Sequence, residues 1–287
     1  MNEKTYAKGY LSVGQAWGIL GLGMLFTFVI FLPTVVFTAN SLGDELASFL
    51  GYTVTFGATF WVAHIFYKKE VGHVRYDLSL SSVKVMALAM LVICCLQIGV
   101  TIPIASLIPM PEIFKQAFSQ MAQNKGLFGF LTVVIVAPVL EEFIFRGVIL
   151  KGLLKKYSPH KSILLSSFLF GIMHFNPWQF VTAMVIGVFS GWVFYKTKKL
   201  SLSILIHVVN NALAFVPLYF MQQDSASQMD LSWMQGIEQG YGSLLNFGLV
   251  VAGAVMTSVF GIMILNKEWS KPKAVEGNVV EELAVED

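Results

Sequence analysis

The chain has 287 residues, of which 56% are hydrophobic and 13% charged, and its formal net charge is +2. An ordinary soluble domain carries about 25% charged residues. The composition therefore excludes a disordered chain, a coiled coil and a nucleic-acid-binding domain with a basic face, and it argues against a soluble enzyme.

Apolar segments of the length needed to cross the hydrocarbon core, about 20 residues, recur along the chain. They predict an all-α fold, a polytopic transmembrane helical bundle with about eight spans. The fifth segment has only about 15 residues, so a full crossing and a re-entrant piece both stay open for it. The expected spans are residues 16–37, 46–67, 85–108, 127–150, 162–176, 178–195, 200–221 and 243–265.

The positive charges alternate between the two sides of these spans. If the N-terminus faces the cytosol, 16 of the 19 Lys and Arg residues lie in cytosolic segments, two lie outside and Arg146 lies within a span. This bias is the one that the positive-inside rule requires, so both termini are expected in the cytosol. We expect a single membrane domain over residues 1–287 with a mobile polar tail at 267–287. The short loops favour a bacterial plasma membrane.

Charged residues within the expected spans are confined to the fourth, which carries Glu141, Glu142 and Arg146. A charge at mid-bilayer costs about 2.5–3.5 kcal/mol, so a functional site is the default hypothesis. Glu142 and Arg146 have the favoured i,i+4 spacing of an ion pair, whereas Glu141 should point about 100° away and stay free. The alternatives are a purely structural ion pair and a protonated acid that hydrogen-bonds between helices.

Two histidines of later spans lie at a similar depth to Glu141. Counted from the cytosolic boundary at 1.5 Å per residue, Glu141 lies about 15 Å deep, His174 about 20 Å and His207 about 12 Å. These depths permit one intramembrane cluster, although histidines in spans also serve simply as interhelical hydrogen-bonding groups. His64 has no comparable partner and is expected to pack. Gly187 and Gly191 form a small-residue face that lets a neighbouring helix approach closely.

Three short motifs carry a resemblance to a known family. Residues 137–147, APVLEEFIFRG, resemble the Glu-Glu-x-x-x-Arg motif of the CPBP family, the CAAX-prenyl protease and bacteriocin-processing (Abi-type) intramembrane proteases. Residues 170–174, FGIMH, resemble its Phe-x-x-x-His motif, and residues 207–211, HVVNN, its His-x-x-x-Asn motif. The resemblance covers a catalytic core of residues 126–217. Each motif alone is weak, but all three in order on successive helices are specific.

The resemblance implies an intramembrane endopeptidase that hydrolyses a peptide bond of a peptide or protein substrate in or at the lipid bilayer. Glu141 would activate water together with His174, and His207 and Asn211 would stabilise the oxyanion. Glu142 and Arg146 would brace the site. The family is often called a metalloprotease family, and Glu141, His174 and His207 could supply three ligands to a divalent metal such as zinc. We favour a mechanism without an obligatory metal.

Two other functions compete with the peptidase. A bacteriocin-immunity or peptide-binding membrane protein would use the same pocket without catalysis, and its function would survive loss of the Glu141 carboxylate. A proton- or metal-coupled transporter also uses intramembrane acids and histidines. Transporters often show paired repeats, whereas here all intramembrane carboxylates and the arginine fall in one helix without a counterpart in the first half.

Overall fold

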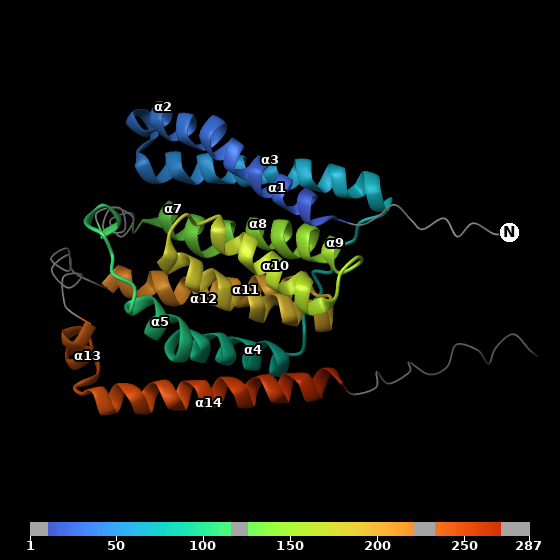
Figure 1. Cartoon of the computed structure of the whole chain (residues 1–287). Helices are drawn as coiled ribbons and strands as arrows, with labels where there is room; N and C mark the ends of the chain where they lie inside the picture. The colour runs from blue at the N-terminus through green and yellow to red at the C-terminus, as the bar shows by residue number, and fades with distance from the viewer. Residues whose placement is uncertain (1–10, 116–125, 221–232, 271–287) are drawn as a thin grey trace, which may run out of the picture.

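The computed structural model describes residues 11–115, 126–220 and 233–270, and every regular element in these ranges is helical (Figure 1). The one extended contact among them is an isolated bridge between Asp77 and Lys199. The all-α class expected from the sequence is confirmed. The α-helices are α1 (Val13–Phe26), α2 (Leu32–Leu42), α3 (Asp44–Val71), α4 (Val83–Leu96), α5 (Ile102–Ser106), α7 (Leu127–Phe130), α8 (Ala137–Glu142), α9 (Lys151–Leu153), α10 (Pro159–Ile172), α11 (Pro177–Thr197), α12 (Leu200–Phe220), α13 (Trp233–Tyr241) and α14 (Leu244–Trp269).

Each of the eight expected spans contains a helix, but the lengths differ. Among the described residues, six helical stretches are long and apolar enough to cross a membrane: Val13–Leu42, Asp44–Val71, Val83–Ser106, Leu127–Leu153, Pro177–Thr197 and Leu244–Trp269. These stretches identify a multi-pass membrane protein. α10 has 14 residues and measures about 21 Å, less than the roughly 30 Å of hydrocarbon. The fifth segment therefore does not cross on its own length, and α12 contributes the shorter apolar stretch Leu200–Val216.

The fourth stretch lies in the middle of the bundle. In Figure 1, α1, α2 and α3 form one side, and α4 and α14 form the other. α8 lies between them and contacts both α3 and α12. α10 and α11 pack against each other as a hairpin, and α10 also packs against the continuation of α8. This placement buries the charged residues of the fourth stretch inside the bundle.

π-helical turns interrupt three of the long stretches just before a proline. They are η1 (Thr27–Phe31), η2 (Gln97–Thr101) and η3 (Leu131–Val136), and Pro33, Pro103 and Pro138 each follow as the second residue of the next α-helix. Proline lacks an N–H and its ring clashes with the carbonyl four residues earlier. A wider turn relieves that clash. The fourth π segment, η4 (Phe143–Leu150), is not followed by such a proline and begins directly after Glu142.

The small-residue face of α11 lies against α10, as the sequence predicts. A Cβ atom on Gly187 would lie 2.8 Å from Ser167 Cβ and 3.1 Å from Ser167 Cα. A Cβ atom on Gly191 would lie 3.2 Å from Ile163 Cγ2. The hairpin turns at Phe175, whose φ of 55° is left-handed. His174 therefore lies on the α10–α11 connection and not inside a helix, which corrects its expected position within the fifth span.

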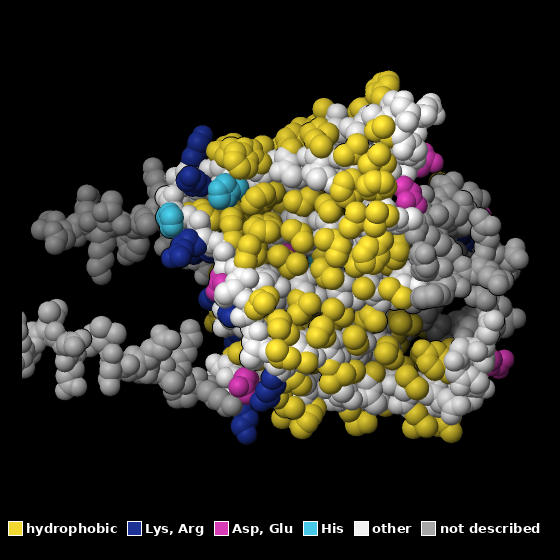
Figure 2. Space-filling view, turned by 180° about the vertical axis from the view of Figure 1, so that it is seen from behind, with side chains coloured by type: hydrophobic (Ala, Val, Ile, Leu, Met, Phe, Trp, Pro, Cys, Tyr) yellow, Lys and Arg dark blue, Asp and Glu magenta, His cyan; other side chains and the backbone are white. Residues whose placement is uncertain are grey.

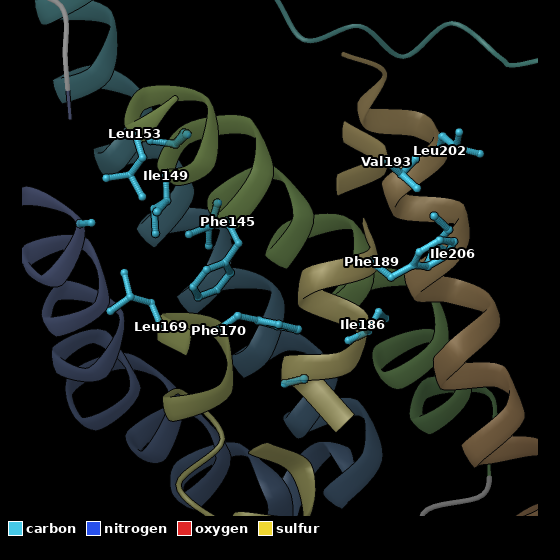
Figure 3. Close-up of a cluster of buried hydrophobic side chains, with 14 of the residues drawn as sticks. Phe145, Ile149, Leu153, Leu169, Phe170, Ile186, Phe189, Val193, Leu202 and Ile206 are labelled. Atoms are coloured by element: carbon cyan, nitrogen blue, oxygen red, sulfur yellow. The ribbon is translucent and has the colours of Figure 1, made fainter. Parts of the chain in front are cut away.

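A buried apolar cluster surrounds the charged residues of the fourth helix. Phe145 and Phe170 pack at a centroid distance of 5.0 Å, and Figure 3 shows them beside residues from α11 and α12, among them Ile186 and Ile206. Since this cluster holds the backbones of the fourth helix, α10 and α12 together, it fixes the positions of the polar side chains that these elements carry.

The surface separates charge from apolar area. On the face shown in Figure 2, the visible Lys and Arg side chains gather at one end, and hydrophobic side chains cover the flank. This separation agrees with the positive-inside arrangement; that this end faces the cytosol stays a prediction. α14 continues to Trp269, so the start of the expected tail is helical. Residues 271–287, the rest of that tail, lie outside the described ranges.

Candidate active site

The fourth stretch carries its three charges in the interior of the bundle. Glu141 and Glu142 end α8, and Arg146 follows in η4. Glu141 is 7% exposed, and Glu142 and Arg146 are fully buried. Arg146 Nη1 lies 2.9 Å from Glu142 Oε1. This is the i,i+4 ion pair that the spacing predicts.

His207 of α12 links the two carboxylates. Its Nδ1 lies 3.1 Å from Glu142 Oε1, and its Nε2 lies 3.6 Å from Glu141 Oε2. Glu141 and Glu142 thus diverge on the helix, as their spacing predicts, and still meet different nitrogens of the same ring. Neighbouring residues of a helix do diverge, but an imidazole ring carries nitrogens on two edges and can face both side chains at once.

Charge balance limits the protonation of this cluster. Two carboxylates and one guanidinium leave one negative charge in a volume with almost no solvent, and a buried net charge is costly. One further proton makes the cluster neutral. Because Arg146 already pairs with Glu142, a neutral cluster would hold this proton on the Glu141–His207 pair.

Tyr52 is a site residue that the sequence reasoning missed. Its hydroxyl lies 2.5 Å from Glu141 Oε1 and donates a hydrogen bond to it. Tyr52 also stacks on Phe56, one turn further along α3, at a centroid distance of 4.2 Å. No motif marks it. The sequence feature that could have identified it is the Tyr52 hydroxyl within the second apolar segment, because a buried Tyr hydroxyl usually has a hydrogen-bond partner.

His174 reaches the cluster through Phe170. His174 Nδ1 lies 3.0 Å from the Phe170 carbonyl oxygen, which can only accept, so Nδ1 carries a hydrogen and Nε2 takes no part in this contact. The Phe170 ring meets the imidazoles of His174 and His207 edge to face, at 5.1 and 5.4 Å. Arg146 lies 4.9 Å from the same ring. Phe170 is therefore a packing surface that His174, His207 and Arg146 share.

Asn211 makes a contact that the motif does not suggest. Its Nδ2 donates to the carbonyl oxygen of Val133 at 2.8 Å. In the π-helical pattern of η3, Ala137 N–H donates to Thr132, so the donor for Val133 would be residue 138, which is proline and has no N–H. Asn211 thus satisfies a carbonyl that Pro138 leaves without a donor. This bond joins α12 to the segment immediately before Glu141.

The expected metal ligands do not form a ligand set. Within the described residues, no three His, Cys, Asp or Glu side chains come together in a way that could hold a metal ion. Glu141 and His207 face each other, but the bonded partner of His174 is the Phe170 carbonyl. The residues present therefore do not fit a zinc site of the kind considered, and no chemical step is derived through a metal.

The remaining intramembrane histidine stands apart from this cluster. His64 Nδ1 lies 2.8 Å from the Tyr76 hydroxyl, in an aromatic group with Phe60 and Phe143. Its expected packing role agrees with these contacts.

A multi-pass helical bundle with a buried Glu–His–Arg cluster is the class that these observations define. Residues 123–213 match the model of the family described as Type II CAAX prenyl endopeptidase Rce1-like. Over 101 residues, 34% of this chain, the sequence is 29% identical to "Putative membrane peptidase YdiL" of Bacillus subtilis (strain 168). The match spans 41% of that relative's length. No solved structure matches the chain. The resemblance that the three motifs indicate is confirmed for this segment.

Proposed function

We propose that the protein is an intramembrane endopeptidase that hydrolyses a peptide bond of a membrane-associated substrate by a glutamate-dependent mechanism. The observation that carries this proposal is the position of Glu141. Its carboxylate is buried in the bundle between the Tyr52 hydroxyl and the His207 imidazole. The Rce1-like family match and the name of the relative support the reaction class.

The proposed reaction uses the single proton of the Glu141–His207 pair. In the resting site both glutamates are ionised and His207 is protonated. Glu141 takes a proton from water, and the water oxygen attacks the carbonyl carbon of the scissile bond. The negative charge moves from Glu141 to the new oxyanion, which accepts a hydrogen bond from His207 Nε2. The cluster and the bound oxyanion together keep a net charge of zero, so no net charge builds up in a water-poor site.

Collapse of the tetrahedral intermediate completes the reaction. The C–N bond breaks, and Glu141 returns its proton to the leaving amine. His174 orients the attacking water together with Glu141. Glu142 and Arg146 hold His207 in place. We assign Asn211 the positioning of the Glu141 segment through Val133, in place of the direct oxyanion contact that the family resemblance implies.

The decisive experiment replaces Glu141→Gln, which keeps the shape but removes the base. Glu70→Gln is the matched control, because Glu70 is exposed at the end of α3. Purified variants are assayed with quenched fluorescent peptides, each offered with and without a farnesylated cysteine. We expect kcat to fall by about 10²–10⁴ for Glu141→Gln, with an unchanged melting temperature and a fully active control.

Three results would reject the proposal. Cleavage at the original rate by a well-folded Glu141→Gln protein would remove the glutamate mechanism. Equal binding of a peptide by both proteins, without cleavage by either, would favour the non-enzymatic immunity function. Transport into sealed vesicles that requires Glu141 would favour the transporter.

A further inference from the structure

A basic pocket of about 730 Å³ lies outside the Glu–His cluster, between the α3–α4 connection, α9 and the end of α11. It belongs to the end of the molecule where the Lys and Arg side chains gather (Figure 2). Its lining combines cationic and apolar side chains: Arg75, Tyr76, Asp77, Leu78, Lys151, Leu154, Lys155, Phe194 and Lys198. Neither the peptidase chemistry nor the three motifs use this pocket.

The pocket carries an excess of positive charge. Four cationic side chains line it, against the single carboxylate of Asp77. Asp77 Oδ1 accepts a hydrogen bond from the Ser79 N–H at 2.9 Å, and the Ser79 contacts lower the pKa of Asp77. Across the ranges that the structure describes, none of the four cations has a carboxylate oxygen within ion-pair distance. An anion is therefore the missing complement.

The cations are held in place by groups without charge. Lys151 Nζ donates to the Arg75 carbonyl oxygen and lies 5.5 Å from the centre of the Tyr76 ring. Lys198 Nζ lies 4.6 Å from the centre of the Tyr195 ring. Burial lowers the pKa of Lys198, and a bound anion would counter this effect. The lysines are thus positioned before any ligand arrives.

The backbone at Lys198 adds an independent observation. Lys198 ends α11 with a φ of 61°, in the left-handed region. This position after a helix is usually glycine, because a side chain there is strained. The chain nevertheless places a lysine at this point, and this residue lines the pocket. Strained backbone conformations cluster at functional sites, so the left-handed conformation of Lys198 favours a functional role for this pocket.

We propose that this pocket binds the phosphate group of an anionic ligand, with the headgroup of an anionic phospholipid as the favoured source. Leu78, Leu154 and Phe194 give the pocket an apolar side that inorganic phosphate does not need. The α3–α4 connection also borders a second groove of about 260 Å³, which is lined by Leu80, Met86, Leu205 and Val208 among others. Basic pockets between transmembrane helices on the cytoplasmic side suit such headgroups.

The test uses the full-length protein in detergent and follows its melting temperature. Phosphatidylglycerol, phosphatidylcholine and inorganic phosphate are titrated separately. The pocket variant is Lys155→Gln with Lys198→Gln, and the matched control is Lys68→Gln with Lys69→Gln, which removes two exposed charges near the end of α3. A third variant, Lys198→Gly, removes one pocket charge and relieves the left-handed strain.

We expect phosphatidylglycerol to raise the melting temperature of the original protein and of the Lys68/Lys69 control, while phosphatidylcholine does not. The pocket variant should need at least about tenfold more phosphatidylglycerol to reach half of the full rise in melting temperature. This factor corresponds to a loss of about 1.4 kcal/mol in binding free energy. Lys198→Gly should melt no lower than the original protein and still respond more weakly, so unfolding cannot explain the loss.

Each other outcome also decides the proposal. A response to inorganic phosphate that the pocket variant loses, without a response to phosphatidylglycerol, supports the phosphate site and assigns it to a soluble anion. Equal titrations for the pocket variant and the control would overturn it, as would equal stabilisation by phosphatidylcholine and phosphatidylglycerol. None of these results depends on peptidase activity.

Discussion

The Tyr52 hydroxyl lies 2.5 Å from Glu141 Oε1 and connects α3 to α8 across 89 positions of the sequence. The other oxygen of Glu141 faces His207 Nε2 across 3.6 Å, a gap longer than a direct hydrogen bond. Oε1 of Glu141 is therefore held by a hydrogen bond, whereas Oε2 faces His207 without a direct hydrogen bond. This asymmetry suits a base whose second oxygen must accept a proton from a third molecule.

Replacing Tyr52→Phe removes the fixed side of this arrangement and leaves the ring. A hydrogen bond to a charged group contributes about 1.5–3 kcal/mol, so we predict that kcat falls about 10- to 100-fold, with little change in KM. Tyr157→Phe is the control, because its ring lies among lysines at the basic end. Steady-state kinetics on both variants check this. An equal loss in the control, or a change confined to KM, would contradict the positioning role.

Arg146 is predicted to matter mainly for stability. Arg146→Met removes the guanidinium from the buried Glu142 carboxylate and leaves His207 as its remaining partner, and breaking a buried ion pair in this way costs about 3–5 kcal/mol. The double variant with Glu142→Gln removes both charges and should recover most of this loss. Unfolding of the original protein, both single variants and the double variant in denaturant gives the coupling energy. A double variant that is no more stable than Arg146→Met would show that the ion pair is not the source of the effect.

Asn211 and Pro138 are predicted to be coupled through the Val133 carbonyl. Asn211→Leu leaves that carbonyl without a donor and should cost about 1–3 kcal/mol. Pro138→Ala supplies a backbone N–H at the position where η3 lacks one, so Asn211→Leu should cost less in that background. A double-mutant cycle on the free energy of unfolding measures the difference. Additive effects would mean that Asn211 stabilises the protein in another way.

Gly187 is predicted to set the distance between α10 and α11. Gly187→Ala forces a shift against Ser167 Cβ and Cα and should cost about 1–3 kcal/mol. Gly253→Ala in α14 meets no atom within 4 Å and should be neutral or gain about 0.5–1 kcal/mol from helix propensity. Thermal unfolding of both variants compares them. Similar losses at both positions would show that close approach is not the reason for the glycine.

Metal removal is predicted to leave peptidase activity in place. Dialysis against a zinc chelator should not change kcat/KM if Glu141 and His207 activate water without an ion. Metal analysis of the purified protein accompanies the assay. Loss of activity on dialysis, with recovery on addition of zinc alone, would contradict the glutamate-dependent mechanism.

The helical architecture could be predicted from the sequence because lipid requires long apolar helices. The Glu142–Arg146 pair could be predicted because both residues lie on one helix, where spacing fixes geometry. The contacts of Glu141 could not, because Tyr52 and His207 reach it from other helices whose rotation depends on packing. The position of His174 on a connection was missed for a similar reason, since apolar residues run through the turn at Phe175.

The π-helical turns are only partly marked in the sequence, and the sequence analysis does not predict them. Pro33, Pro103 and Pro138 mark three of them in the sequence, since each proline disrupts the hydrogen bond of the turn before it. η4 has no such marker, and turns of this kind are frequent at functional sites. The Asn211 contact depends on knowing that η3 is π-helical, so it became apparent only with the structure.

The location of the counterions also has a consequence for biogenesis. Arg146 travels on the same helix as Glu142, so this pair enters the bilayer already assembled. Glu141 has its partners on α3, made earlier, and on α12, made later. A chain that ends before α12 lacks His207, so Glu141 has no imidazole partner inside the membrane. An unpaired acid there carries a free-energy cost. The cluster can therefore form only after α12 has been synthesised. A chain that ends before α12 keeps an unpaired acid in the membrane and is expected to be degraded.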